Sequence, residues 1–392
     1  MICLWVNKRE WMHPGPILSV GLENARSLAS IGIETHLCCG AGERSDTAGD
    51  LRAFYGAEPH ELLTVHRVGS LGGGVVRGST PVYLRACAVA RELARRDRVA
   101  VLTRDPGFLP FLAWLCRDRR IRGFYEAHNL LADLSWRTER VGWAERRDGW
   151  LERAFLPRIS GLVAITRKQR ELYDGIFARL PSCALPLGTR PMAVGAWEIE
   201  RRRALRTLIY VGHLHGFKGV SRLLGLAQKL SVKFGIRLMF LGGAPQQLVR
   251  FRERALGLEA SGAVSFRPFV SPRELAGVLD SGASVGAALL EDTYYNRYLT
   301  CPAKVLDYMS HGLPVLATDL PSTRDLLGDA GIYAPRRGKF ASALVGLLSS
   351  PEAYASAASA IMRRAVDLSW ENRARRLAAF MGDRFGDVPG GT

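Results

Sequence analysis

Short apolar runs alternate with amphipathic segments along the first half of the chain. Residues 2–6 form an apolar run that predicts a buried strand, and residues 17–31 repeat apolar side chains at helical spacing after the loop 7–15. The same alternation predicts further strands at 34–38, 98–102 and 123–127, and helices at 83–96 and 108–116. Because strands and helices alternate, we expect a parallel sheet with helices on both faces.

A second series of the same kind begins at Thr207. Between the two series, residues 191–206 lack an apolar strand and carry a basic run, so we interpret them as a linker. The later apolar runs predict strands at 207–212, 237–241, 264–266, 283–289 and 313–318. A chain of 392 residues is long enough for two full cores. We therefore predict a first domain at 1–190, the linker, a second domain at 207–368, and a helix with its tail at 369–392.

The segment 301–319 carries the most specific chemistry. Pro302 suits the first turn of a helix, and Gly312 suits its end, so we predict a short helix at 302–311. Its first amides lack partners inside the helix and therefore attract an anion. Lys304 and Asp307 lie three residues apart, on neighbouring positions of one helix surface. This combination is typical of a diphosphate site with a carboxylate one turn further along.

Several motifs together resemble the family-4 retaining glycosyltransferases of GT-B fold. Residues 302–319 resemble the donor-site segment of that family, and 207–219 resemble its Val-Gly-Arg-Leu-x-x-x-Lys-Gly loop, with matches at Lys218 and Gly219. The resemblance extends to 185–189, 321–327 and 369–371, so it covers most of the chain.

This resemblance implies an α/β fold of GT-B type, in which two Rossmann-like domains with parallel sheets face each other across a cleft. The C-terminal helix would cross back to the first domain. The implied catalytic residues are His128, Lys218 and Asp307, where His128 follows the strand 123–127 and would lie near the transferred sugar. The implied donor-binding residues are Gly15, Gly212, His213, Lys218, Phe269, Val270, Cys301, Pro302, Ala303, Lys304 and Asp307.

The sequence departs from the family pattern at three positions. His213 replaces the usual arginine, and histidine is largely neutral at pH 7 and lacks the forked donors of a guanidinium. Leu299 stands where the family often has its first acidic residue, and Asp307 is one carbon shorter than the usual glutamate. We therefore expect the donor diphosphate to depend more on Lys218, Lys304 and the helix start.

The function implied is a retaining glycosyltransferase of hexosyltransferase type in polysaccharide biosynthesis. It would move a sugar from a UDP- or GDP-sugar to a glycan, a lipid-linked or a small-molecule acceptor, without a metal or a cofactor. A nucleotide-sugar epimerase or a phosphorylase of the same architecture is an alternative, although it would need a second base or a cofactor lysine. A non-catalytic GT-B relative that binds a partner is another, because two usual residues are missing.

The formal net charge of +17 favours an anionic partner, although a general preference for arginine over lysine explains it equally well. Trp136, Trp143 and Trp150 recur every seven residues, which places them on one stripe of a helix surrounded by arginines. They either dock this helix on the sheet or form a surface, at 136–153, for an anionic membrane. We do not expect a nucleic acid as partner, because the basic residues are scattered.

The remaining composition points to the cytoplasm. The seven cysteines are an odd number without metal-ligand spacing, which is typical of buried thiols in a reducing compartment. The sequence contains no apolar run of about 18 residues and opens without a charged leader. We therefore expect a cytoplasmic protein, with peripheral association at the inner face of the membrane as the alternative.

Overall fold

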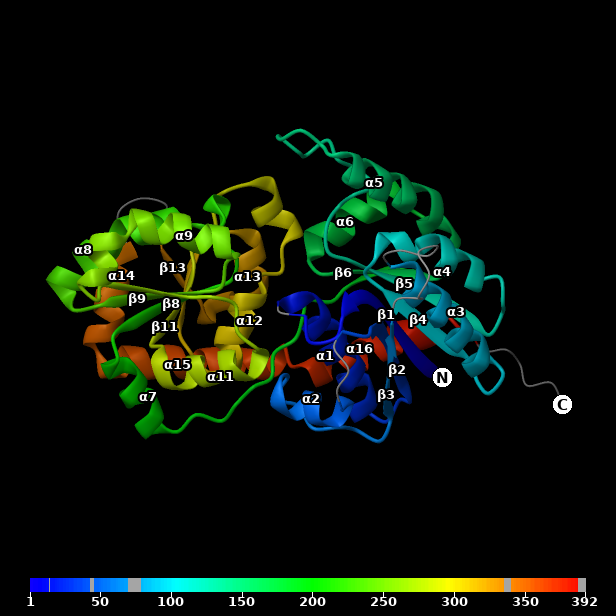
Figure 1. Cartoon of the computed structure of the whole chain (residues 1–392), viewed down its shortest axis with the longest axis horizontal. Coiled ribbons are helices and arrows are strands. Elements are labelled where there is room, and N and C mark those ends of the chain that lie inside the picture. The colour runs from blue at the N-terminus through cyan, green and yellow to red at the C-terminus, as the bar shows by residue number, and fades with distance from the viewer. Residues whose placement is uncertain (14, 43–45, 70–78, 335–339, 387–392) are drawn as a thin grey trace. The chain divides into compact units, whose positions relative to one another are not determined.

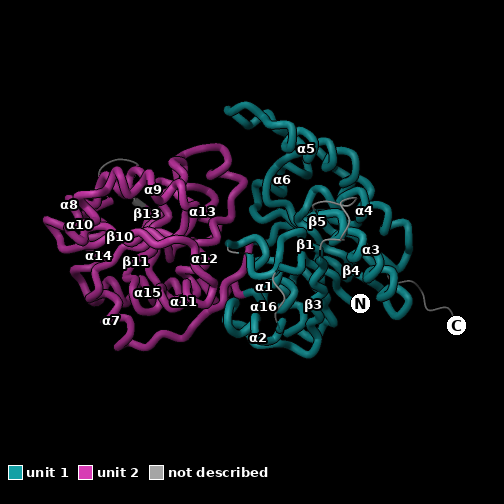
Figure 2. Tube along the Cα trace, in the orientation of Figure 1, with its two compact units in different colours: residues 1–186, 370–392 teal, residues 187–369 magenta. Residues whose placement is uncertain are grey.

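The computed structural model describes residues 1–13, 15–42, 46–69, 79–334 and 340–386 (Figure 1). The chain divides into two compact units, as Figure 2 shows. Unit 1 comprises residues 1–186 together with 370–392, and unit 2 comprises residues 187–369. The chain therefore passes from unit 1 to unit 2 and back again.

Unit 1 contains a seven-stranded parallel sheet in the order β3-β2-β1-β4-β5-β6-β7. Its strands are β1 (Ile2–Glu10), β2 (Thr35–Gly40), β3 (Leu63–Val68), β4 (Val99–Thr103), β5 (Ile121–Ala127), β6 (Gly161–Ala164) and β7 (Ser182–Ala184). Its helices are α1 (Pro16–Ser30), α2 (Thr47–Ala53), α3 (Thr80–Ala94), α4 (Leu109–Leu115), α5 (Trp143–Phe155), α6 (Arg167–Ile176) and α16 (Trp370–Gly382).

Helix α16 completes the core of unit 1. Its Leu377 and Met381 belong to the same buried cluster as Trp5 of β1 and Leu22 of α1. Burying apolar side chains of this size stabilises a fold by roughly 1.5–3 kcal/mol each. The prediction that the C-terminal helix crosses back to the first domain is confirmed.

Unit 2 contains a six-stranded parallel sheet in the order β10-β9-β8-β11-β12-β13. Its strands are β8 (Thr207–Val211), β9 (Arg237–Leu241), β10 (Val264–Arg267), β11 (Val285–Ala288), β12 (Val315–Thr318) and β13 (Ile332–Ala334). Its helices are α7 (Ala196–Ala204), α8 (Val220–Phe234), α9 (Pro245–Arg254), α10 (Leu256–Ala260), α11 (Pro272–Gly282), α12 (Ala303–Ser310), α13 (Pro321–Leu327), α14 (Phe340–Ser349) and α15 (Pro351–Asp367). Two parallel, helix-flanked sheets confirm the predicted α/β architecture.

Two segments differ from the sequence patterns. The predicted linker contains helix α7, which packs against α15 and α11 within unit 2. Its buried Arg202 pairs with Asp280 of α11 and with Glu198 of α7 itself. Helix α5 begins at Trp143, so Trp136 precedes the helix instead of sharing a stripe with Trp143.

The exposure of the tryptophans of α5 tests one of the two interpretations of that stripe, docking on the sheet. Trp143 is 75% exposed and Trp150 is 62% exposed. Docking on the sheet is therefore wrong for these two side chains. Trp136 lies in the preceding loop, where its indole N–H donates to the carbonyl of Leu130 at 3.1 Å. Within the described ranges, no helix has the length and apolar character needed to cross a membrane.

Candidate functional site

Two glycines allow the loops after β8 and β9 to lie close together at the carboxyl edge of the unit 2 sheet. Gly212 follows β8 with φ 121°, and a Cβ at this residue would lie 3.8 Å from the amine nitrogen of Lys304. A Cβ at Gly242, which follows β9, would lie only 2.5 Å from the carbonyl oxygen of Gly212. In open α/β sheets ligands bind at this edge. Lys304, from the start of α12, therefore lies beside the end of β8.

The amine of Lys304 is buried without a hydrogen-bond partner among the described residues. It lies 3.5 Å from the ring centroid of Tyr210, whose π face attracts a cation. Burial, and then the charge of Lys218, hold the pKa of Lys304 well below its usual value, whereas Asp307 opposes the shift. A buried amine without an anion is costly, and such unsatisfied groups concentrate at binding sites.

Lys218 ends the short 3₁₀ turn Gly216–Lys218 that precedes α8. Its amine donates to the side-chain oxygen of Asn296 at 3.4 Å, and burial lowers its pKa to about 8. Because the charge of Lys218 lowers the pKa of Lys304, the two amines share one electrostatic environment. The structure thus brings together two lysines that are 86 positions apart in the sequence.

Asn296 is a site residue that the sequence patterns do not reveal. Its side-chain amide donates to the carbonyls of Phe217 and Glu291, each at 2.9 Å, so it clamps the Lys218 loop to the segment after β11. Asn296 is fully buried within a π-helical turn, Tyr295–Leu299. Both the burial of Asn296 and its partners become visible only in the fold, so the sequence offered no signal for this residue.

The Lys218 loop also requires glycine at position 219. Gly219 has φ 79°, and a Cβ at this residue would lie 1.8 Å from the carbonyl oxygen of Leu289. Any side chain would push α8 away from the end of β11. The close approach therefore fixes Lys218 and the start of α8 relative to the sheet.

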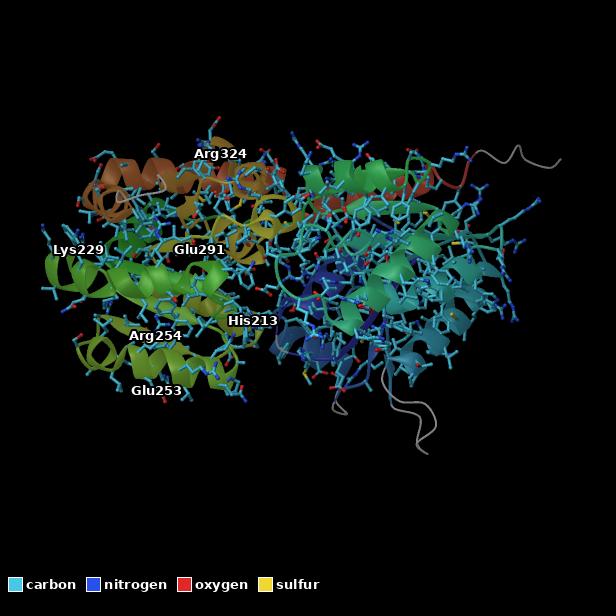
Figure 3. The ribbon with its side chains drawn as sticks, turned by 90° about the horizontal axis from the view of Figure 1, so that it is seen from above. His213, Lys229, Glu253, Arg254, Glu291 and Arg324 are labelled. Atoms are coloured by element: carbon cyan, nitrogen blue, oxygen red, sulfur yellow. The ribbon has the colours of Figure 1, made fainter. Side chains whose placement is uncertain are left out.

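His213 lies on the loop that follows β8 (Figure 3). Its ring packs against the Phe269 ring in a T-shaped arrangement, with the centroids 4.8 Å apart. The backbone carbonyl of His213 accepts a hydrogen bond from the Tyr210 hydroxyl at 2.6 Å. Partial burial, and then the positive charges of His215 and Lys304, lower the pKa of His213. The imidazole is therefore neutral at pH 7 and offers one donor. Val270 follows Phe269 and is half-buried.

The start of α12, formed by Cys301, Pro302 and Ala303, is held against β8 by Tyr308. The Tyr308 hydroxyl accepts from the backbone N–H of Val211 at 2.9 Å and donates to the carbonyl of Ile209 at 3.2 Å. A Cβ at Gly286 would lie 2.2 Å from the Tyr308 ring, so glycine makes room for the ring on β11. The sequence motif includes Tyr308, but its role in positioning the helix follows only from these contacts.

Asp307 lies one turn into α12, as predicted. Burial raises the pKa of its carboxyl to about 6, against the opposing charges of His311 and Lys304. The carboxyl is thus mostly ionised at pH 7. Leu299, in contrast, is fully buried, so the usual position of the first acidic residue contributes to the core. Glu291, labelled in Figure 3, and its neighbour Asp292 are exposed acidic residues close to Leu299 in the sequence.

Gly15 and His128 belong to unit 1. Gly15 precedes α1 with φ 109°, and a Cβ there would meet no atom within 4 Å. His128 follows β5, and its Nε2 lies 2.6 Å from Oε1 of Glu126. Burial, and then the charge of Arg104, lower the pKa of His128 to about 4, so the ring is neutral at pH 7.

The arrangement in unit 2 is suited to a diphosphate. Two amines and the backbone N–H groups in the first turn of α12 all favour negative charge, and glycines leave room for backbone approach. The unit 2 residues of the predicted donor site are therefore distributed over the loops after β8 and β10 and the start of α12: Gly212, His213, Lys218, Phe269, Val270, Cys301, Pro302, Ala303, Lys304 and Asp307.

Comparisons with known proteins give the following findings. Residues 205–350 match the family model described as "Glycosyl transferases group 1". No curated protein sequence matches the chain. The structure of HepE from Anabaena, in complex with UDP-glucose, is similar with a TM-score of 0.68 at 14% identity, covering 98% of this chain and 100% of that one.

Two further solved structures are similar over the whole length. WaaG, described as a glycosyltransferase involved in lipopolysaccharide biosynthesis, has a TM-score of 0.64 at 17% identity, with full coverage of both chains. Sucrose-phosphate synthase from Thermosynechococcus elongatus has a TM-score of 0.63 at 17% identity and covers 98% of each chain. At these identities the structures establish the shared GT-B fold.

Proposed function

Residues 205–350 match the glycosyl transferases group 1 family model, and from this match we propose that the chain is a retaining glycosyltransferase with a nucleotide-sugar donor. The observation that carries the proposal is the buried amine of Lys304, which has no partner in the described part of the chain and lies beside Gly212 and the start of α12. A diphosphate at this position would pair with that amine.

The protein must stabilise the negative charge that develops on the departing nucleoside diphosphate. Lys218, Lys304 and the helix start at Cys301–Ala303 would supply positive charge and backbone dipoles there, and His213 would supply one further donor. Asp307 would accept hydrogen bonds from the ribose hydroxyls, and the backbone at Phe269 and Val270 would face the base. Because these groups balance the charge of the diphosphate, we propose a reaction that needs no metal.

The mechanism that we propose for retention of configuration assigns no residue of the protein as a general base. The leaving phosphate would take the proton of the acceptor hydroxyl as the bond to the anomeric carbon breaks. His128 would then position the sugar, and Gly15 would line the acceptor side.

The donor that we propose is a UDP- or GDP-sugar. The complex of HepE with UDP-glucose supports a UDP-sugar, because the two chains share their fold over nearly their whole length. Backbone contacts near Phe269 would not distinguish one nucleotide base from another, so the panel of nucleotide sugars identifies the base.

The test is a panel of UDP- and GDP-sugars measured by thermal unfolding. A ligand at 100 times its Kd should add about 2.7 kcal/mol to the free energy of unfolding. Lys218→Ala should lose this stabilisation, whereas Lys229→Ala should keep it, because Lys229 lies exposed on α8, away from His213 (Figure 3). If both variants respond alike, the donor site is wrong. Stabilisation without release of nucleotide, with or without acceptor, would identify a non-catalytic binding protein.

We further propose a lipid-linked acceptor and peripheral association with an anionic membrane at the cytoplasmic face. Trp143 and Trp150 project from α5 on the side opposite the buried Gly149 and Glu152. Arg146 is exposed on the same side of the helix. Indole rings and cations are both favourable in the interface of an anionic bilayer.

Flotation with vesicles tests this surface. Trp143→Ser/Trp150→Ser should lose most binding to vesicles that contain phosphatidylglycerol, and the wild type should bind pure phosphatidylcholine much less. Trp197→Ser is the matched control, because Trp197 is 76% exposed but lies on α7 of unit 2. Equal flotation of all three proteins would exclude α5 as the contact surface.

A further inference from the structure

A buried arginine of helix α16 contacts the carboxylate of Glu126, which in turn binds His128. Arg373, in the first turn of α16, donates from Nη2 to Oε2 of Glu126 at 2.5 Å and from Nε to the carbonyl of Pro186 at 2.9 Å. Its Nη1 donates to the side-chain oxygen of Asn24 on α1. The side chains of Arg373 and Glu126 are 4% and 1% exposed, so this ion pair is almost removed from water.

The second oxygen of Glu126 binds the imidazole of His128. Oε1 of Glu126 lies 2.6 Å from Nε2 of His128. Burial would raise the pKa of Glu126, but the charge of Arg373 and the bond from His128 outweigh it and lower this pKa to about 2. An ionised carboxylate only accepts hydrogen bonds, so the nitrogen that faces it must carry the proton. His128, which is neutral at pH 7, therefore has its proton on Nε2.

We propose that Arg373 and Glu126 are positioning residues that fix His128 as the Nε2–H tautomer, so that Nδ1 accepts a hydrogen bond from a substrate hydroxyl. This inference rests on the proposed sugar transfer and deepens it. Without Arg373, a lone carboxylate at this depth would take up a proton and could then donate to Nε2. The tautomer would reverse, and Nδ1 would become a donor.

The location of Arg373 also connects His128 with both places where the chain changes units. Pro186 is the last residue of unit 1 before the chain enters unit 2, and α16 starts where the chain returns. The guanidinium of Arg373, in the first turn of α16, thus contacts both the last residue of unit 1 before the chain enters unit 2 and the carboxylate that binds His128. A buried ion pair by itself is weak evidence for stability, since apolar residues of similar volume often replace one without loss of stability. Hence we assign this ion pair to orientation of His128.

The test is the ¹⁵N NMR spectrum of histidine-labelled protein at pH 7. The wild type should show His128 with a protonated Nε2 and an unprotonated Nδ1, assigned by the loss of these signals in His128→Gln. The double variant Glu126→Leu/Arg373→Met removes both charges, so neither is left unpaired, and it should show a mixture of tautomers. Arg376→Met, an exposed change on the same helix, should keep the wild-type signals.

Two further readouts separate this inference from the proposed function. The thermal stabilisation by UDP should be unchanged in the double variant, because the diphosphate site is in unit 2. Turnover of the nucleotide sugar selected by the panel should fall at least tenfold in kcat, with KM within twofold. An Nδ1–H tautomer in the wild type, or an unchanged tautomer in the double variant, would overturn the inference while leaving the donor site intact.

Discussion

Replacing Lys304 by methionine should make the ligand-free protein more stable while abolishing donor binding. The wild-type amine is buried, has no hydrogen-bond partner in the described residues, and is repelled by Lys218. Methionine keeps an unbranched chain of similar length and removes the ionisable group. Binding sites commonly contain residues that lower the stability of the free protein in this way.

The magnitude follows from the depressed pKa. An unfolded lysine has a pKa of about 10.4, and each pKa unit corresponds to about 1.36 kcal/mol. Even if the amine is wholly unprotonated in the folded protein at pH 7, the cost of removing its proton is at most roughly 5 kcal/mol. We expect about 1–3 kcal/mol, because residual protonation is stabilised by the Tyr210 ring, which lies 3.5 Å from the amine. For a unit of about 180 residues this raises Tm by roughly 2–4 °C per kcal/mol.

The assay is unfolding by heat and by urea, with and without UDP. Lys304→Met should raise Tm without ligand, and UDP should not raise it further. Because the folded pKa is lowered, the unfolded wild type binds more protons, so wild-type stability should rise with pH up to about 10.4, and the variant should lack this slope. Lys229→Met, at an exposed position of α8, should leave both properties unchanged. A less stable Lys304→Met protein, or one that UDP still stabilises, would refute the reasoning.

Three further outcomes follow from the same site. UDP affinity should fall more steeply above about pH 8, by an additional tenfold per pH unit, because Lys218 has a pKa of about 8 and must regain its proton to pair with the diphosphate. Calorimetry measures this affinity. The Lys218→Arg variant, which keeps its charge, should show no such steepening. Gly219→Ala should destabilise unit 2 by more than about 3 kcal/mol, since its Cβ would lie 1.8 Å from the Leu289 carbonyl, and urea unfolding measures the loss. Tyr308→Phe should cost about 1–3 kcal/mol by the same measurement, because the buried N–H of Val211 loses its acceptor; an unchanged urea midpoint would contradict this.

The sequence was most informative where local pattern and local chemistry agree. The helix expected at 302–311 is α12, Ala303–Ser310, because a proline at its start and a glycine after its end leave little freedom in its bounds. Lys304 and Asp307 could be assigned to one helix surface from spacing alone. That Lys218 and Lys304 lie near each other could be predicted only from the resemblance to a family, because periodicity does not indicate which loops lie close together.

Other features depend on contacts between distant segments. Asn296 clamps a loop through the carbonyl of Phe217, which is 79 positions away in the sequence, and Tyr308 fills a space that exists only because residue 286 is glycine. The stripe of tryptophans misled at Trp136, since a seven-residue spacing continues through a loop as readily as through a helix. The spacing places Arg373 on the apolar stripe of α16, between Trp370 and Leu377, but it does not state which groups its guanidinium would meet.

The discontinuous make-up of unit 1 sets an order on biosynthesis. When residue 186 has left the ribosome, the first sheet is complete in strands but still lacks α16, so Glu126 has no guanidinium and the cluster around Trp5 has an open side. Unit 2 is contiguous and has all its residues before α16 is translated. We therefore expect unit 2 to fold first in the nascent chain, and the core of unit 1 to be completed last, after α16 has been synthesised.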